Sequence, residues 1–499
     1  MSRRIVNIVN FVRGAEPRNP SKDLLAPVVG EIELVKKYNF PNTFLLQYDA
    51  LILEQYQEIF KREADENMEI GIWIECVRQL IEACGLEWRG DPNVTWDWHV
   101  VPGFLMAYTQ NERKLIIDEF MNKFRKIFGY LPKIVGSWML DSWSIDYMSR
   151  EYDIKAFAIC REQYGVDAYT LWGGYMNQGY YPSKKNILCP AQTEENQVTT
   201  PLFRMLGPDP IYVYDEAAYN IEGCATLEPV WKCGYDEEIV NSIFKSYFEE
   251  ECMDYSYATL GQENSFGWER IQRGLPMQLE KIDKLRQENK VVVEKLSETG
   301  EWFKRTHSKN SVGSFISHSD WAGNGIKSIW FNSPLYRANL LLEKDSLYFR
   351  DINKYDENYE ERYLVTPCET PSAIQDNLPV VDGRMWNGDG IKSGLKFKTT
   401  VSDFTQCKEN DTLICEAKCP EGKISIILSE EGINIIKPAD VLIYFERARE
   451  NDTQIEIKEK QLCFVHNGYG YDVNFNCALH KTESGYELGA GVEDINIRF

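Results

Sequence analysis

Two hydrophobic patterns alternate over the first 310 residues of the chain. Continuous apolar runs, such as the one at 4–12, predict buried strands, and stretches with an apolar residue every three or four positions, such as 111–128, predict amphipathic helices. This alternation is typical of a parallel sheet covered by helices. The runs that predict strands lie at 4–12, 42–48, 69–74, 133–139, 155–160, 211–214 and 254–260.

Seven parallel strands predict a closed or nearly closed (β/α)7-type barrel, whose active site lies in the loops at the carboxyl ends of the strands. The long segment 165–208 has room for an eighth strand, and loops of that length inside a compact domain are usually functional. The charged amphipathic stretch 276–304 predicts one helix that closes the barrel.

After residue 311 the pattern changes to short β-type runs separated by turn signals, which is typical of a β-sandwich. The runs are SIWFN, SLYFRDI, DGRMWNGDG, GLKFKTT, TLICEAK, KISIIL, VLIYFERA, TQIEIK, QLCFVH and YELGAG. The sequence therefore predicts an α/β fold class with two domains, a barrel at 1–310 and an all-β sandwich at 311–499.

The charge balance excludes several classes of partner. The chain has 55 basic and 77 acidic residues and a formal net charge of −22, which repels phosphate backbones and anionic lipids, so we expect no nucleic acid partner. No apolar stretch reaches the roughly 18 residues of a membrane helix, and the start lacks a signal-peptide core. We therefore expect a cytoplasmic protein.

Acidic residues follow most of the predicted strands, and aromatic residues make up 13% of the chain. Each carboxylate alone is explained by a helix cap or a loop salt bridge. Several carboxylates converging at one end of a barrel fit a glycoside hydrolase, because that reaction needs one carboxyl group as acid and another as nucleophile or base. Aromatic rings are suitable surfaces for sugar rings.

Five sequence motifs carry a resemblance to known proteins: NFVRGAEPR, GSWMLDSW, TLWGGYMNQGYYPSKKN, GPDPIYVYD and GQENSFGWE. The chain resembles seven-fold barrel enzymes of the polysaccharide deacetylase and family 57 glycoside hydrolase type. It is more similar to a group of uncharacterised bacterial barrel-plus-sandwich proteins. In family 57 the nucleophile follows strand four and the acid follows strand seven, so the resemblance implies Asp141 and Glu263 in these roles, with the two residue types exchanged.

The same superfamily includes metal-dependent deacetylases, which need an Asp together with an HxxxH pair. The five histidines, at 99, 307, 318, 466 and 480, form no such pair. A metal site could only be built from Asp49, Glu75 and His99, so we expect no metal and no other cofactor. No signature of a nucleotide-binding loop or of a serine hydrolase is present.

The sequence thus predicts a metal-independent retaining glycoside hydrolase that acts on a small oligosaccharide or glycoside, with Asp141 as nucleophile and Glu263 as acid/base. Two alternatives stay open, a deacetylase-like hydrolase and a non-catalytic carbohydrate-binding protein. The sandwich could bind glycan, cover the barrel or mediate formation of a homo-oligomer. The expected substrate-binding residues are Arg13, Glu16, Asp49, Glu75, Trp98, His99, Trp138, Glu162, Trp172, Tyr175, Asp215 and Trp268.

Overall fold

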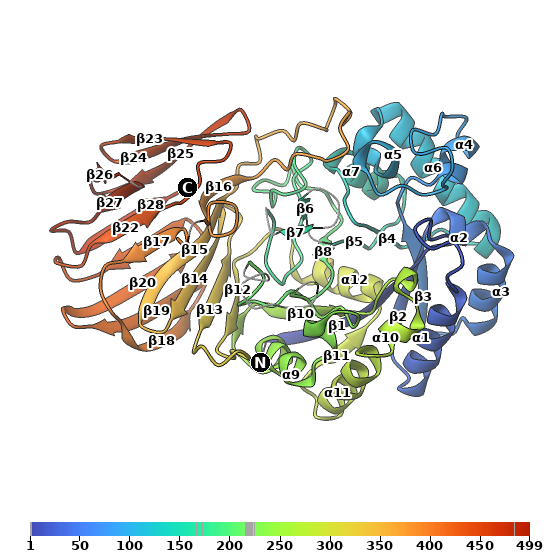
Figure 1. The fold of residues 1–499 in the computed structure, drawn as a ribbon, viewed down its shortest axis with the longest axis horizontal. Coiled ribbons are helices and arrows are strands. Elements are labelled where there is room, and N and C mark those ends of the chain that lie inside the picture. Colours follow the sequence, from blue (N-terminus) through green and yellow to red (C-terminus); the bar gives the residue numbers. More distant parts are fainter. Residues whose placement is uncertain are drawn as a thin grey trace.

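A computed structural model describes residues 2–160, 173–214, 223, 225–388, 390–483 and 485–499, together with the backbone of 162–164 and 168–170. Figure 1 shows an α/β barrel at one end of the molecule and stacked antiparallel sheets at the other. The barrel strands are β1 (Arg3–Val12), β2 (Asn42–Leu46), β3 (Met68–Trp73), β4 (Ile134–Ser137), β5 (Ala156–Ile159), β8 (Leu202–Arg204) and β10 (Tyr255–Leu260).

These seven strands are parallel neighbours in the order β10-β1-β2-β3-β4-β5-β8. Side chains bridge the seam between β8 and β10, where the rings of Phe203 and Tyr257 have centroids 5.1 Å apart. β11 (Val292–Glu294) pairs with β1 along the edge opposite to β10. The structure confirms the predicted fold class of a nearly closed seven-stranded barrel followed by an all-β region.

The sixth strand does not lie where the hydrophobic pattern placed it. The run 211–214 forms a turn, and β8 comes from the long segment 165–208. The short hairpin of β6 (Glu162–Tyr164) and β7 (Ala168–Thr170) lies at the start of this segment, with β6 just before it. Ile211 and Tyr212 are buried against sandwich residues such as Leu341 instead. The apolar run was therefore real, but it packs against the second domain.

Helices cover the outside of the barrel. The predicted helix 111–128 is α6, which has a capping box in which Thr109 and Glu112 satisfy each other's backbone amides. The predicted helix 276–304 is two helices, because the chain turns at Asn289 with a φ of 57° and forms β11. The helices are α1 (Leu25–Lys37), α2 (Tyr48–Ile52), α3 (Glu54–Glu63), α4 (Arg78–Ala83), α5 (Val100–Gly103), α6 (Gln110–Phe128), α7 (Ser142–Glu151), α8 (Lys232–Tyr235), α9 (Glu237–Phe248), α10 (Trp268–Ile271), α11 (Leu275–Gln287) and α12 (Leu296–Thr306).

Two antiparallel sheets with a shared apolar core follow the barrel. The first contains β9 (Cys252–Met253), β12 (Gly313–Ser317), β13 (Lys327–Asn332), β14 (Tyr336–Glu343), β15 (Ser346–Lys354), β16 (Leu378–Asp382), β17 (Gly394–Phe397), β22 (Ile443–Glu446), β26 (Leu479–Lys481) and β27 (Gly485–Leu488). The second contains β18 (Ser402–Glu409), β19 (Thr412–Cys419), β20 (Gly422–Ser429), β21 (Gly432–Ile436), β23 (Thr453–Lys458), β24 (Gln461–His466), β25 (Tyr469–Phe475) and β28 (Asp494–Arg498). Of the predicted runs, DGRMWNGDG mainly forms turns after β16.

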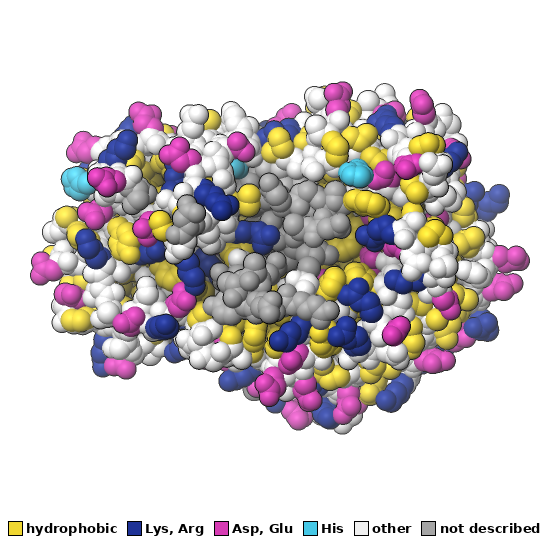
Figure 2. Space-filling view, in the orientation of Figure 1, with side chains coloured by type: hydrophobic (Ala, Val, Ile, Leu, Met, Phe, Trp, Pro, Cys, Tyr) yellow, Lys and Arg dark blue, Asp and Glu magenta, His cyan; other side chains and the backbone are white. Residues whose placement is uncertain are grey.

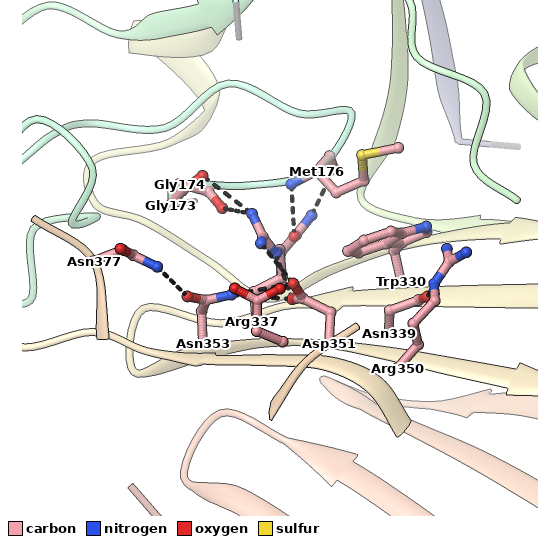
Figure 3. Close-up of polar contacts among 12 residues, drawn as sticks. Gly173, Gly174, Met176, Trp330, Arg337, Asn339, Arg350, Asp351, Asn353 and Asn377 are labelled. Atoms are coloured by element: carbon pink, nitrogen blue, oxygen red, sulfur yellow. Dashed lines mark hydrogen bonds and ion pairs between the residues drawn. The ribbon is translucent and has the colours of Figure 1, made fainter. Parts of the chain in front are cut away.

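The first sandwich sheet is joined to the barrel by buried polar side chains. Figure 3 shows Arg337 of β14 between Asp351 of β15 and a barrel loop. The guanidinium pairs with the Asp351 carboxylate at 3.1 Å and donates to the carbonyls of Gly173 and Gly174, each at 3.1 Å. Burying a charge is costly unless it is paired and hydrogen-bonded, as it is here. This network therefore fixes the barrel loop to the sandwich.

The segment 355–377, which connects β15 to β16, reaches from the sandwich to the barrel; we call it the arm (Figure 1). The Glu361 carboxylate on the arm accepts hydrogen bonds from the backbone amides of Ser142 and Ile187, at 2.8 and 2.9 Å. Burial, and then the nearby Asp141, raise the pKa of Glu361 to about 8. The arm thus docks at the amino end of α7.

Acidic and basic side chains are interspersed over the face drawn in Figure 2. Among the described residues, no helix is long and apolar enough to cross a membrane.

Candidate active site

Arg13 lies at the centre of a buried charged cluster at the carboxyl end of the barrel. It follows β1, and its side chain is 2% exposed. One guanidinium nitrogen, Nη2, lies 3.1 Å from Glu75 Oε1 and 3.4 Å from Glu263 Oε2. The face of the guanidinium stacks on Trp96 at 3.9 Å. The carboxyl ends of β1, β3 and β10 therefore meet at one cation, as parallel strands of a barrel allow.

Residues that follow β2 complete the cluster. Gln47 Nε2 donates to Glu75 Oε2 at 2.6 Å, so both oxygens of Glu75 have partners. Asp49 Oδ1 accepts from the backbone amides of Gly14 and Ala50 at 2.9 and 2.7 Å. A Cβ at position 14 would lie 2.7 Å from the Ala50 nitrogen, so this close approach of two strand ends requires glycine.

Two of the carboxyl groups have pKa values raised above their ordinary range. Burial is the main reason that the pKa of Glu75 is raised to about 7, and Glu263 adds to the rise while Arg13 opposes it. Burial likewise raises the pKa of Asp49 to about 6. A carboxyl group that titrates near neutral pH is suited to general acid catalysis.

A cavity of about 510 Å³ lies beside the loop after β1; its lining includes Gly14, next to Arg13, but not Glu75 or Glu263. Its walls come from the loop after β1, the start of α3 and the segment 93–95, and they include Glu16, Asp23 and Tyr56. The Tyr56 hydroxyl donates to the Arg13 carbonyl at 3.3 Å, and Lys22 Nζ donates to the Ser265 carbonyl at 2.7 Å. The loop after β1 therefore lines the cavity and also carries Arg13.

Asp141 does not belong to this cluster, and the structure contradicts its predicted role as nucleophile. Its side chain is 1% exposed and caps α7 by accepting from the backbone amide and the hydroxyl of Ser144, at 2.9 and 2.8 Å. It also forms a buried ion pair with Arg113 at 2.8 Å. Asp141 therefore caps α7 and pairs with Arg113, away from the Arg13 nitrogen that Glu75 and Glu263 share.

The other predicted residues divide into four groups, and the last group consists of packing residues. Arg13, Asp49, Glu75 and Glu263 form the cluster, and Glu16 lines the cavity, where Arg18 Nε donates to it at 2.9 Å. Trp98 stacks on His99, whose Nδ1 lies 2.7 Å from the Asp97 carboxylate, and both lie at the outer edge of the cluster. Glu162, Trp172 and Asp215 have side chains outside the described residues.

Three predicted sugar-stacking residues are packing residues instead. Trp138 stands edge-on to Phe11 and Trp73 in the barrel core. Tyr175 donates to the Ser311 carbonyl at 2.9 Å, between barrel and sandwich. Trp268 packs against Gly30 of α1, where a Cβ would lie 2.6 Å from its ring. Trp138 and Tyr175 are buried and Trp268 is partly buried, so packing accounts for all three aromatic residues.

The sequence pointed only weakly to Gln47 and Trp96. Both appear in stretches that it singled out, the end of the second strand and the aromatic run before His99. Gln47 contacts Glu75 and Trp96 contacts Arg13, and each contact joins segments that are distant in the sequence. Sequence alone does not show such contacts, so neither residue carried a signal of its role.

Most of the donors that a deacetylase-type metal site would need are already in use, although Asp49 Oδ2 has no hydrogen-bond partner within the described part of the chain. Asp49 Oδ1 is bound to backbone amides, Glu75 is bound to Arg13 and Gln47, and the His99 side chain is 45% exposed and paired with Asp97. Among the described residues no group of three or more His, Cys, Asp or Glu side chains is placed to hold a metal ion. The guanidinium of Arg13 already supplies a positive charge to the carboxylates, so the residues present do not fit such a metal.

The fold, but not the sequence, matches known proteins. No protein-family model and no curated protein matches the sequence significantly. A solved structure from Parabacteroides distasonis, provisionally described as a glycoside hydrolase/deacetylase, is 15% identical, with 76% of this chain and 89% of that chain covered and a TM-score of 0.56.

Two further solved structures are more distant. A provisionally described polysaccharide deacetylase from Mycobacterium smegmatis is 10% identical, with 62% of this chain and 93% of that chain covered and a TM-score of 0.39. A 4-alpha-glucanotransferase from Thermococcus litoralis is 9% identical, with 100% of this chain and 98% of that chain covered and a TM-score of 0.32. These TM-scores are too low to support an argument. The first match shows that the chain has the barrel-based fold of a protein described as a glycoside hydrolase/deacetylase, which confirms, at the level of the fold, the resemblance seen in the sequence motifs.

Proposed function

We propose that this protein is a carbohydrate-active enzyme, a retaining glycoside hydrolase that uses Glu75 as acid/base and Glu263 as nucleophile. The observation that carries this proposal is the contact of both carboxylates with the same nitrogen of Arg13. Glu75 takes the acid role because its raised pKa leaves a proton on it near neutral pH. Glu263 stays in the pair but moves from the predicted acid/base role to that of nucleophile, and Glu75 takes the acid/base role.

The shared nitrogen limits the distance between the two carboxylates. Glu75 Oε1 and Glu263 Oε2 lie within 3.1 and 3.4 Å of it, so these oxygens are at most about 6.5 Å apart. Retaining glycosidases have carboxyl groups about 5–5.5 Å apart, and inverting enzymes need about 6.5–9.5 Å to leave room for a water. The pair therefore favours retention.

The reaction would proceed in two steps. Glu75 donates its proton to the glycosidic oxygen while a Glu263 oxygen attacks the anomeric carbon, which breaks the glycosidic bond and forms a glycosyl ester. Glu75, now a carboxylate, then takes a proton from water as the water oxygen attacks the same carbon, and this releases the sugar and restores Glu263. The Ser265 hydroxyl and Arg13, both in contact with Glu263, would orient it for these attacks.

The cavity suits a small oligosaccharide or glycoside. Its volume is about 510 Å³, within the usual range of about 300–1,000 Å³ for small-molecule sites, and its walls offer carboxylate, amide and hydroxyl groups to sugar hydroxyls. Glu75 and Glu263 are 1% and 3% exposed. A glycoside would therefore reach them only when a covering segment moves.

Hydrolysis of a panel of nitrophenyl glycosides and short oligosaccharides is the experiment that tests this proposal. We expect release of free sugar from at least one member, with the anomeric configuration of the first product retained. Binding of a glycoside without turnover would instead support a non-catalytic carbohydrate-binding protein. Release of acetate from acetylated sugars, with no glycosidic cleavage, would support a deacetylase.

Chelation should leave the activity unchanged. We expect the same rate, within about twofold, after dialysis against EDTA, because most of the candidate metal donors are bound by Arg13 and backbone amides. The measurement compares the dialysed enzyme with the same sample after addition of Zn²⁺, Co²⁺ or Ca²⁺. A loss on chelation that one of these ions restores would contradict the proposed mechanism.

The activity should fall as the pH rises through about 7. Glu75 must carry a proton to act as the acid, and its pKa is raised to about 7, so kcat/KM should decline tenfold per unit above that pH. The measurement is kcat/KM between pH 5 and 9. A dinitrophenyl glycoside is the control. Its leaving group needs no proton, so kcat/KM for this substrate should show much less of the decline. A flat profile with the less activated substrate would rule out Glu75 as the acid.

A further inference from the structure

Another buried carboxylate lies beside the proposed catalytic pair. Glu228, which precedes α8, is 1% exposed. Its Oε1 accepts from Gln262 Nε2 at 3.2 Å, and its Oε2 accepts from Thr226 Oγ1 at 2.9 Å. A buried carboxylate normally needs partners of this kind, and here the partners connect it to the end of β10.

Gln262 connects Glu228 to the proposed nucleophile. Its side-chain Oε1 accepts from the backbone amide of Glu263 at 2.9 Å, while its Nε2 donates to Glu228. The backbone amide of Gln262 donates to Asn10 Oδ1 at 3.0 Å. An amide side chain has one accepting and one donating end, so the carboxylate of Glu228 determines which end faces Glu263.

The chain immediately before Gln262 has little freedom to compensate. Gly261 has a φ of 111°, and a Cβ there would lie 2.3 Å from the Val9 carbonyl oxygen. The close approach of β10 to β1 thus permits only glycine, and the bonds of Gln262 then fix the direction in which the Glu263 side chain leaves the backbone.

We propose that Glu228 is a positioning residue that acts through Gln262 to hold Glu263 in the geometry needed for attack. The catalytic part of this inference rests on the proposed function. Its structural part, the orientation of Glu263 by Glu228, does not depend on the substrate.

Two variants separate positioning from charge. Glu228→Gln keeps a carbonyl oxygen for Gln262, and its amide can donate to the Thr226 hydroxyl, so the network can persist. Glu228→Ala removes the acceptor and leaves the Gln262 amide free to turn. We expect Glu228→Ala to lower kcat about 30- to 100-fold with KM within about threefold, since displacing a reacting group by about 1 Å costs roughly 10²-fold. Glu228→Gln should keep kcat within about fivefold of the wild-type value.

The experiment combines kinetics with crystal structures of the wild type, Glu228→Ala and Glu228→Gln, and Gln262→Ala is the substitute if Glu228→Ala does not fold. We expect Glu263 Oε2 to leave Arg13 in the Ala variant and to remain beside it in the Gln variant. An unmoved Glu263 with unchanged kcat would overturn the inference, as would equal loss of activity in both Glu228 variants. If the wild type hydrolyses no glycoside but Glu263 still moves only in the Ala variant, the positioning role stands and the proposed function fails.

Discussion

Glu75→Gln and Glu263→Gln should each reduce kcat on an unactivated glycoside by at least about 10³-fold, because each removes a group that makes or breaks a bond. Glutamine keeps the size of the side chain, and its carbonyl oxygen can still accept a hydrogen bond from Arg13. The loss should therefore come from chemistry and not from misfolding. Steady-state hydrolysis, together with thermal unfolding of each variant, is the measurement.

The two variants should also differ in a diagnostic way. Azide should restore part of the activity of Glu75→Gln on an activated glycoside, because the second step then needs no general base. Glu69→Gln is the control: Glu69 is a partly buried glutamate near the start of β3, the strand that Glu75 follows, and it accepts from Thr43 and Ser297. Its variant should keep kcat within about threefold. Full activity in Glu75→Gln or Glu263→Gln would show that the wrong carboxylates had been chosen.

Arg113→Met should destabilise the protein by about 3–5 kcal/mol, because it leaves the buried carboxylate of Asp141 without its cation. Arg113 is 0% exposed and also donates to the Tyr363 carbonyl of the arm at 2.6 Å, so the variant should loosen the arm as well. Chemical denaturation followed by circular dichroism measures the free energy of unfolding.

Two comparisons isolate this effect. Arg150→Met removes the exposed partner of Asp146, and both residues lie on α7. It should lower the free energy of unfolding by less than about 1 kcal/mol. The double variant Arg113→Met/Asp141→Asn removes both charges and should recover part of the loss, which a double-mutant cycle quantifies. If Arg113→Met costs no more than Arg150→Met, Asp141 does not have the structural role that its hydrogen bonds indicate.

Much of the architecture could be predicted because local hydrophobic patterns determine it. The apolar run of β1 and the capped helix α6 each match the period of the element that they form. The sixth strand was misplaced because Ile211 and Tyr212 are buried against sandwich residues, and a period cannot reveal which domain buries a residue. For the same reason the docking of the arm could not be foreseen.

The candidate site was predictable as a region but not as a pair of residues. The rule that parallel strands present their carboxyl ends together correctly brought Glu75 and Glu263 to one place. It could not separate Asp141 from them, because a carboxylate after a strand can equally begin the next helix. The sharing of Arg13 by two distant strands, and the resulting pKa of Glu75, depend on three-dimensional packing alone.

Trapping the glycosyl ester tests the central proposal most directly. The protein would be incubated with a set of 2-deoxy-2-fluoro glycosides that bear good leaving groups, and the labelled peptide would be identified by mass spectrometry. The account predicts one fluorosugar per chain, attached to Glu263, with loss of hydrolytic activity in proportion to labelling. A label on Asp141 or any other residue, or full hydrolytic activity with no label from the matching fluoroglycoside, would contradict it.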